Sequence, residues 1–510
     1  MWSFFENIAP KEDVTDEELE AGIPWYFKDG VASQILDSIT VGPFLIAFAL
    51  DLGANNIVIG LLAAIPFLTQ LFQLPAIFLI ERTKARKAVT LAACAIYRPM
   101  LLVMGSAAFF LGSPFALPVL VSGFAGRYIL GSISACSWNS WMKDFLPEDR
   151  IGKIFANRMF KMMVASVIIS LVAAWFVDAW PKMFPDYSIY RYSILLVIAF
   201  ISGVYGLTCM YHMPEPKMKS AGLQKSFVSK LLMPFKDHNF KNLMIFLGTW
   251  NFAVNLAAPF FTVHMLKRLE ISITLVTILT ILSQISNLMI IKSWGKIADN
   301  FSNKSVLTIA APLFIGCIFA WTFTALPEKH HFTLLLLVLI HIFTGVATAG
   351  VTLATGNISL RLAPKGEATS YLSVNSLVNN LAAGIAPVFG GLFADFFSNK
   401  ELSLMVSWKS GAEGLLLQTL NFRYWDFFFL FATIIGIYSI YRLFKIKEEG
   451  DVEENIVLHE LMAEIRGNMR NFRNISSVSG IKMAIHFPIE KIKIHKKKRH
   501  KKAKDESSNQ

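Results

Sequence analysis

Long apolar stretches recur along the 510-residue chain, and they constrain its fold more than any other feature. Each stretch has about 20 residues, which is enough for a helix to cross a ~30 Å hydrocarbon core. Charged residues make up only 16% of the chain, below the ~25% that is usual for soluble domains. The alternating ten-residue segments of a transmembrane β-barrel are absent. The sequence therefore predicts an all-α integral membrane protein, with twelve spans at about 28–50, 55–80, 88–112, 115–141, 155–178, 189–212, 240–266, 271–294, 304–327, 332–360, 367–396 and 423–446.

The loops that join these spans alternate between loops rich in lysine and arginine and loops poor in them. Loops after spans 2, 4, 8 and 10 are basic, whereas those after spans 1 and 3 carry no Lys or Arg. By the positive-inside rule both termini are cytoplasmic, and the even number of spans agrees. We therefore expect a multi-pass protein of the cytoplasmic membrane with a cytoplasmic N-terminal segment (1–27), a first bundle (28–212), a cytoplasmic connector (213–239), a second bundle (240–446) and a cytoplasmic basic tail (447–510).

The segments outside the spans carry most of the net charge of +12. The acidic N-terminus lacks the basic and apolar regions of a signal peptide. Residues 223–235 are amphipathic and fit a surface helix or a plain linker. Residues 452–475 predict a helix with an apolar stripe of Ile456, Leu458, Leu461, Met462 and Ile465. The run KIKIHKKKRHKKAK (491–504) fits a solvated tail or one attracted to anionic lipid headgroups, and it lacks the aromatic residues expected of a nucleic-acid site.

A loop motif links the two halves of the chain. The second half contains WGKIADNFSNK, in which Gly295 and Asp299 stand four residues apart on one helix face. The stretches 137–154 and 355–372 match each other at an offset of 357 − 139 = 218 from Asn139 to Asn357. The same offset carries Asp299 back to 299 − 218 = 81, which is Glu81 in the basic run ERTKARK. The motif and its degenerate copy resemble the cytoplasmic loop motif of the major facilitator superfamily, roughly G-x-x-x-D-[RK]-x-G-[RK]-[RK].

This resemblance implies a fold and a way of moving. Two pseudo-symmetric six-helix bundles would rock about a central site, and the cytoplasmic loops would latch one state. When the cytoplasmic side is closed, Asp299 should meet the start of span 5, near Lys153 to Arg158, and Glu81 should approach span 11 near Ala368. The residues we assign to gating are Glu81, Arg82, Asp144, Arg158, Gly295, Asp299 and Arg361.

Three ionisable residues lie deep in predicted spans, where an unpaired charge costs at least ~2.5 kcal/mol. Asp37 in span 1, Arg98 in span 3 and Arg127 in span 4 are each ~15–18 Å from a span end, near the bilayer midplane. We expect Asp37 to pair with an arginine and the surplus positive charge to face a central cavity. The alternative is a purely structural pair of Asp37 with Arg98.

Neutral polar residues in other spans are further candidates for substrate contact. Facing a cavity, their amides and hydroxyls would suit hydroxyl-rich or carboxylated solutes. Interhelical hydrogen bonds are the alternative for each asparagine, and an ordinary hydrogen-bonded role is the alternative for the histidine. This set contains Gln70, Gln73, Trp250, Asn251, Asn255, Gln284, His341, Thr344, Asn375 and Asn379.

The motifs of soluble enzymes are missing. The sequence has no P-loop, no G-x-S-x-G, no H-E-x-x-H and no paired cysteine motif, so we expect neither an enzyme nor a cofactor or metal. We predict a monomeric secondary permease for a small organic solute, anionic or polyhydroxylated, with proton coupling as our hypothesis for its energy source. A uniporter, an exporter of amphiphiles, and a non-transporting receptor or assembly factor stay open. A membrane transferase would need convergent acids, and the cluster Asp144, Glu148 and Asp149 is better explained by gating.

Overall fold

A computed structural model describes residues 9–12, 14–147, 150–218, 232–325, 332–364, 367–410, 413–450, 456–464 and 466. Within these ranges, twelve helical segments are long and apolar enough to cross a membrane. This confirms the predicted integral membrane fold with twelve spans. In lipid a helix satisfies every backbone hydrogen bond within its own segment, which is why each apolar run becomes one.

The first six spans contain several interrupted helices. Gly42, with a φ of 63°, and Pro43 at the start of α3 divide the first span, and Pro66 lies just before the 3₁₀ turn η1 in the second. The elements are α2 (Asp16–Thr40) and α3 (Pro43–Asp51), then α4 (Asn56–Leu68), η1 (Thr69–Phe72) and α5 (Gln73–Thr83), then α6 (Arg86–Tyr97), α7 (Met100–Ser106) and η2 (Ala107–Phe110), and finally α8 (Ala116–Phe145), α9 (Ile151–Met183), η3 (Pro185–Tyr187) and α10 (Tyr190–Tyr211).

The last six spans follow the short helix α12 (Met233–Lys236). They are α13 (His238–Val263), continued by a π-helical turn, η4 (His264–Arg268), then α14 (Ile273–Asn300), α15 (Asn303–Trp321) with η5 (Thr322–Ala325), α16 (Thr333–Leu362), α17 (Ala368–Phe397) and α18 (Trp425–Phe444). Between α17 and α18 the strands β1 (Glu401–Ser410) and β2 (Glu413–Arg423) pair antiparallel from Glu401↔Arg423 to Ser410↔Glu413. This hairpin is an addition to the predicted all-α fold.

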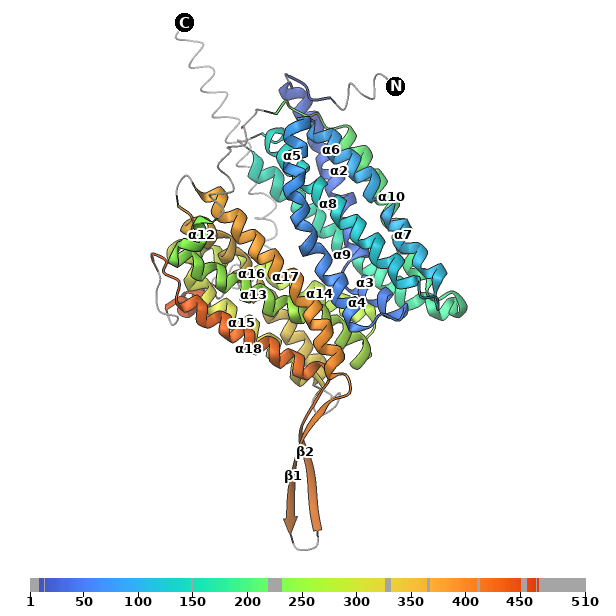
Figure 1. Cartoon of the computed structure of the whole chain (residues 1–510), viewed down its shortest axis with the longest axis vertical. Coiled ribbons are helices and arrows are strands. Elements are labelled where there is room, and N and C mark those ends of the chain that lie inside the picture. The colour runs from blue at the N-terminus through green and yellow to red at the C-terminus, as the bar shows by residue number, and fades with distance from the viewer. Residues whose placement is uncertain are drawn as a thin grey trace, which may run out of the picture.

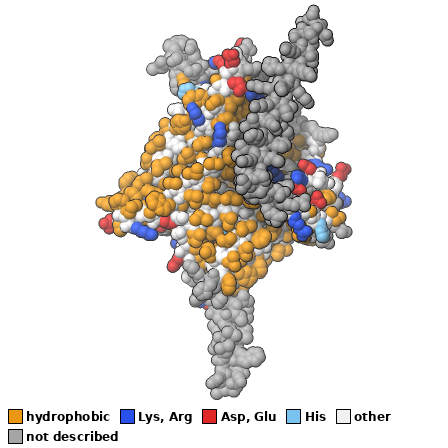
Figure 2. Space-filling model, turned by 180° about the vertical axis from the view of Figure 1, so that it is seen from behind, with side chains coloured by type: hydrophobic (Ala, Val, Ile, Leu, Met, Phe, Trp, Pro, Cys, Tyr) orange, Lys and Arg blue, Asp and Glu red, His pale blue; other side chains and the backbone are white. Residues whose placement is uncertain are grey.

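The helices form two bundles, one built from α2 to α10 and the other from α12 to α18 (Figure 1). The bundles lie close together near the β-hairpin and diverge toward the opposite side, where α2 begins and α18 ends (Figure 1). We call the side from which the hairpin projects the hairpin side and the opposite side the tail side. Figure 2 shows a broad apolar surface with charged side chains gathered toward its edges, as expected for a protein embedded in lipid.

One predicted boundary needs correction. The first helix begins at Asp16 rather than at residue 28, because Thr15 and Glu18 form a capping box in which the Thr15 hydroxyl accepts the Glu18 N–H at 3.2 Å. The sequence carries a signal for this helix start, because Thr15 and Glu18 have the T-x-x-E spacing of a capping box.

Of the helix predicted over 452–475, the structure describes residues 456–464 and 466, and these are helical. Val457 and Leu461 are buried, whereas Ile456, Leu458 and Met462 are exposed. The predicted stripe is therefore right for Leu461 and wrong for Ile456, Leu458 and Met462, and it missed the buried Val457. Ile465, the basic run 491–504 and residues 223–231 lie outside the described residues.

Candidate functional site

The two bundles contact each other closely on the hairpin side, where α4 packs along α17. A Cβ atom placed on Gly60 would lie 2.1 Å from the carbonyl oxygen of Pro387, and one on Gly391 would lie 2.4 Å from the carbonyl oxygen of Asn56. Both distances are shorter than a side-chain contact allows, so only glycine permits this approach. The small residues therefore let the bundles seal the hairpin side.

Polar contacts reinforce this closure at two places. The Asn56 side-chain amide donates to Asp395 Oδ1 and to the Tyr424 hydroxyl, both at 2.6 Å. On the other side of the interface the Asp178 carboxylate accepts the N–H groups of Ile273 at 3.2 Å and Thr274 at 2.8 Å. These N–H groups form the positive end of the α14 dipole. Each contact joins a residue of one bundle to residues of the other.

The tail side shows the opposite arrangement. There α5, which continues the same span as α4, packs on α8 of its own bundle. Asp299 and Arg82 are exposed, and Glu81 is half-buried. Among the described residues, a Cβ on Gly295 would meet only a methyl of Leu353, at 3.7 Å, so no described helix lies close against Gly295 in this conformation. The latch predicted for a closed tail side is therefore not formed here.

A cavity of about 260 Å³ lies between the bundles, next to the closed hairpin side. Residues from α3, α4, α8, α13 and α17 line it. Most of the lining is apolar, and its polar side chains are Tyr128, Asn255 and Thr262. Asn255 is one of the predicted substrate-contact residues, whereas Tyr128 and Thr262 were not selected from the sequence.

Asp37 and Arg127 form an ion pair beside this cavity. Arg127 Nη2 donates to Asp37 Oδ1, and the guanidinium carbon lies 5.0 Å from the ring of the cavity-lining Tyr128. The Asp37 side chain is 57% exposed, whereas that of Arg127 is 6% exposed. Arg127 Nη1 is buried and has no hydrogen-bond partner within the described part of the chain. The pair thus offers an accessible carboxylate and an unsatisfied donor.

Arg98 lies elsewhere, so the alternative pair of Asp37 with Arg98 is not formed. Its side chain is buried against Gly203 and Gly206 of α10. A Cβ on Gly206 would meet Arg98 Nη2 at 3.3 Å and Asp29 Oδ1 at 3.4 Å, which places the arginine beside a second acid. The structure therefore places Arg98 inside the first bundle rather than at a central cavity.

That second acid, Asp29, was missed by sequence reasoning. It is fully buried and accepts a hydrogen bond from Arg158 Nη2 at 2.9 Å, while Arg158 Nη1 donates to the Tyr26 carbonyl at 3.1 Å. Asp29 stood at the edge of the predicted first span, where a charge needs no special explanation. In this conformation the predicted gating residue Arg158 belongs to this buried pair rather than to a contact with Asp299.

The other predicted residues are spread over several environments. Gln70 and Gln73 lie at the break between α4 and α5 and bond to each other. The amides of Asn251 and Asn255 donate to carbonyls one turn back in their own helix, at 2.8 Å each. Gln284 is exposed on α14, and Thr344 on α16 is half-buried.

Trp250 and His341 are packing residues of the second bundle, not cavity residues. Trp250 is buried and packs edge-on against Phe314, with ring centroids 5.5 Å apart. His341 is buried beside Trp321, and its Nδ1 lies 2.7 Å from the Leu337 carbonyl oxygen. These two residues differ from the prediction because the rotation of their helices turns each ring into the second bundle and away from the cavity.

Asn375 and Asn379 of α17 have buried side-chain oxygens without a partner among the described residues. The Asn375 amide donates to Ser359 Oγ at 3.1 Å, so this residue makes the interhelical hydrogen bond that was the alternative to substrate contact.

A buried acid holds the tail-side end of each bundle together. In the first bundle Glu215 accepts the N–H groups of Arg86 at 2.7 Å and Lys87 at 3.1 Å, at the start of α6. The Arg86 side chain also reaches Glu215 at 3.3 Å and the predicted gating residue Asp144 at 2.5 Å. Burial of the Glu215 carboxyl raises its pKa, against the effect of these donors. The acid follows span 6 in the stretch MPEPK, which sequence reasoning did not use.

The second bundle repeats this arrangement with Glu448. It accepts the side-chain amide of Asn303 at 2.9 Å and the N–H of Lys304 at 2.7 Å, at the start of α15, and it pairs with Arg361 at 3.4 Å. Arg361 and Asp144 thus stabilise single bundles in this conformation. An acid after the last helix of a bundle thus binds the start of its third helix in both halves.

The sequence matches the family model of the Major Facilitator Superfamily over residues 30–345 and 251–488, which together cover most of the chain. The chain belongs to the major facilitator superfamily. It is a multi-pass membrane transporter of this type, as the resemblance in the loop motif predicted. No curated protein matches the sequence.

Solved structures of similar fold come from transporters of this superfamily. The nucleoside transporter NupG aligns over 84% of this chain and 98% of its own, with a TM-score of 0.58 and 14% identity. A POT family transporter in complex with 5-aminolevulinic acid covers 87% and 100%, with a TM-score of 0.58 and 14% identity. A bacterial homologue of the iron transporter ferroportin in an inward-facing state covers 85% and 99%, with a TM-score of 0.57 and 12% identity. At these identities the likeness concerns the fold alone.

Proposed function

We propose that this protein is a secondary active permease that moves a small organic solute, anionic or polyhydroxylated, by alternating access. The observation that carries the proposal is the exposed Asp37 carboxylate held by a buried Arg127 next to a cavity between the bundles. In this proposal the bundles, residues 16–211 and 233–444, act as the two units that rock about the cavity.

We infer that the tail side faces the cytoplasm. The tail-side ends of the helices and the segments after them carry Arg82, Lys84, Lys143 and Lys217, in keeping with the positive-inside rule. With the hairpin side closed and the tail side open, this conformation would present the cavity to the cytoplasm. Both chain ends would then lie inside the cell.

Proton coupling would follow from competition for Arg127. While Asp37 is ionised, its carboxylate accepts the hydrogen bond of Arg127 Nη2. A proton on Asp37 removes its charge and weakens its hold on Arg127 Nη2, whose N–H groups can then donate to an anionic or hydroxylated group of the solute. Release of the solute would restore the pair and favour loss of the proton. Each cycle would therefore move solute and proton together.

A uniporter or exporter of amphiphilic compounds is the second candidate, and the largely apolar lining of the cavity favours it. Apolar surface would hold the hydrocarbon part of such a solute, and Tyr128 and Asn255 would orient its polar end. Under this alternative Asp37 would stabilise Arg127 without exchanging a proton. The two candidates differ in their response to a pH gradient.

The test is uptake into proteoliposomes, screened over pools of organic anions, polyols and amphiphiles, with and without a pH gradient. We expect a pH gradient to drive accumulation by the wild type, and Asp37→Asn to lose this accumulation while keeping exchange of solute. Arg127→Gln should weaken the apparent affinity for the solute. Asp51→Asn is the matched control, because this acid also pairs with an arginine, Arg191, but lies at the hairpin-side end of α3. Equal pH dependence in the wild type and Asp37→Asn would refute proton coupling through this residue.

A further inference from the structure

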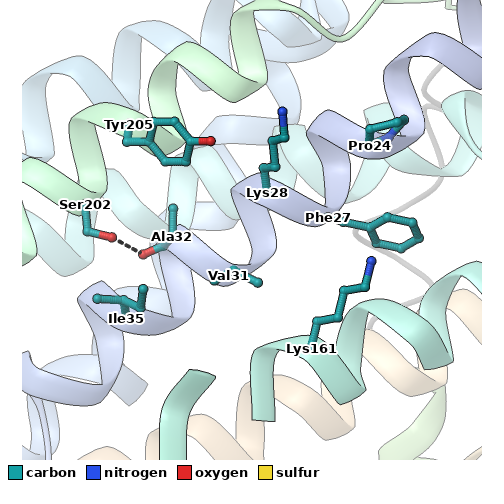
Figure 3. A pocket seen from close by; sticks show the side chains of 9 residues that line it. All are labelled: Pro24, Phe27, Lys28, Val31, Ala32, Ile35, Lys161, Ser202 and Tyr205. Carbon is teal, nitrogen blue, oxygen red and sulfur yellow. Dashed lines mark hydrogen bonds between the residues drawn. The ribbon is translucent and has the colours of Figure 1, made fainter. Parts of the chain in front are cut away.

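An apolar groove of about 540 Å³ lies on the outer face of the first bundle, away from the cavity between the bundles. It forms because α9 and α10 both pack on α2 but make little contact with each other (Figure 3). Val31 and Ile35 of α2 and Tyr205 of α10 line it. The Ser202 hydroxyl donates to the Ala32 carbonyl at 2.9 Å, so the floor presents no unsatisfied polar group at this point.

The groove faces the bilayer rather than the transport path. One face of α2 lines the groove with Lys28, Val31 and Ile35. Asp37 follows Lys28 by nine residues, about two and a half helical turns, so it points to the opposite side of α2. On the neighbouring helix α10, Ile201 is 61% exposed and Tyr205 is 49% exposed. Apolar side chains with this exposure in a membrane-spanning helix are expected to contact lipid tails.

Two lysines flank this groove toward its tail-side end. Lys28 Nζ lies 4.1 Å from the ring centroid of Trp25. Lys161 Nζ lies 4.1 Å from the ring centroid of Phe27, and Figure 3 shows the Lys161 side chain reaching toward this ring. Trp25 stacks on His212 with centroids 4.4 Å apart, which holds the first ring in place. No carboxylate of the described residues pairs with either lysine. The rings position the ammonium groups and leave their N–H donors available to an anion.

We propose that this groove binds one anionic phospholipid of the tail-side leaflet. The phosphate would lie between the ammonium groups of Lys28 and Lys161, and an acyl chain would lie along Val31 and Ile35. Charge complementarity selects this occupant: a zwitterionic lipid brings its own cation to the lysines, whereas an anionic headgroup supplies the missing negative charge. The site is distinct from the Asp37–Arg127 pair and does not depend on the transported solute.

The test compares phosphatidylglycerol with phosphatidylcholine on the purified full-length protein, using native mass spectrometry to count retained lipids and a titration to measure affinity. Each lysine near an anionic headgroup contributes a factor of about five to binding, so Lys28→Gln with Lys161→Gln should weaken phosphatidylglycerol binding about 30-fold. Binding of phosphatidylcholine should not change. Exposed tail-side lysines provide the control, Lys153→Gln with Lys292→Gln, which removes the same charge elsewhere and should change affinity less than about twofold.

A second variant separates the apolar part of the site from its charge. Val31→Trp would fill the groove and leave both lysines, so it should weaken phosphatidylglycerol binding, while glycerol phosphate alone should fail to displace the lipid from the wild type. Unchanged affinity in the double lysine variant, equal affinity for the two lipids, or displacement by glycerol phosphate would each overturn the proposal. Thermal unfolding of every variant in phosphatidylcholine checks that it is folded.

Discussion

Gly60 allows the sharpest test of the hairpin-side closure. Substitution by alanine places a methyl group 2.1 Å from the Pro387 carbonyl oxygen, whereas ordinary contact begins at 3.4 Å. The helices α4 and α17 must therefore separate by about 3.4 − 2.1 = 1.3 Å along this direction, or the closed state must be abandoned. Overpacking of this kind costs about 1–3 kcal/mol. Because the cost arises only where α4 and α17 touch, it should shift the equilibrium away from the hairpin-closed state by about 5- to 150-fold.

The assay measures distances between spin labels on the two bundles. Asp186 and Asn399 are exposed on the hairpin side, one in each bundle, and can be replaced by cysteine for labelling. Of the natural cysteines, Cys94, Cys209 and Cys317 are buried and Cys136 is half-buried, so Cys136→Ser should suffice to limit background labelling. We expect Gly60→Ala to increase the population of long distances.

The control for this substitution is Gly131→Ala in α8, where a Cβ would meet nothing within 4 Å. It adds the same methyl group to a transmembrane helix without touching the interface, so its distance distribution should equal that of the wild type. Gly391→Ala, with its Cβ 2.4 Å from the Asn56 carbonyl oxygen, should act like Gly60→Ala. If Gly60→Ala and Gly131→Ala gave the same distribution, the closure would not depend on glycine packing and the reasoning would fail.

Three further predictions concern charges and the tail helix. Asp29→Asn leaves Arg158 buried without its anion and should lower the free energy of unfolding by about 3–5 kcal/mol. The half-exposed pair of Asp51 with Arg191 should contribute about 1 kcal/mol or less. Chemical denaturation of Asp29→Asn and Asp51→Asn in detergent compares the two pairs. Asp299→Asn should disturb the balance between tail-side open and closed states more than Glu81→Gln, because only the second-half motif keeps its glycine. Equal changes in the accessibility of tail-side cysteines in the two variants would count against this. Leu461→Ala should cost about 2–5 kcal/mol of stability because the Leu461 side chain is buried, and an unchanged Tm would show that the helix 456–464 does not dock.

Much of the fold could be read from the sequence because lipid leaves few options. A run of about 20 apolar residues in a bilayer must satisfy its backbone hydrogen bonds internally, so each run becomes a helix. The number of spans follows directly, and the offset between Asn139 and Asn357 reveals the two halves. The hairpin of β1 and β2 escaped prediction because it lies between spans, where the bilayer imposes no such rule.

The candidate site was predictable only as a set of residue types. Asp37, Arg98 and Arg127 were selected because an ionisable group in a span requires a partner. Which arginine pairs with Asp37 depends on helix rotation and on small residues such as Gly206, which draws α10 close to Arg98. The same limit explains Trp250 and His341, whose polarity suggested a cavity although their rings pack inside the second bundle.

The sequence by itself determined that the chain lies in a membrane, crosses it twelve times and is built from two related halves, because those properties depend on hydrophobic length and on repetition. Tertiary structure alone decided which side of the cavity is closed, which charges meet, and which residues such as Asp29 and Glu215 hold each bundle together. The physical reason is that hydrophobic length is a local property of the chain, whereas a charge pair or a glycine contact exists only where two distant helices are brought into register.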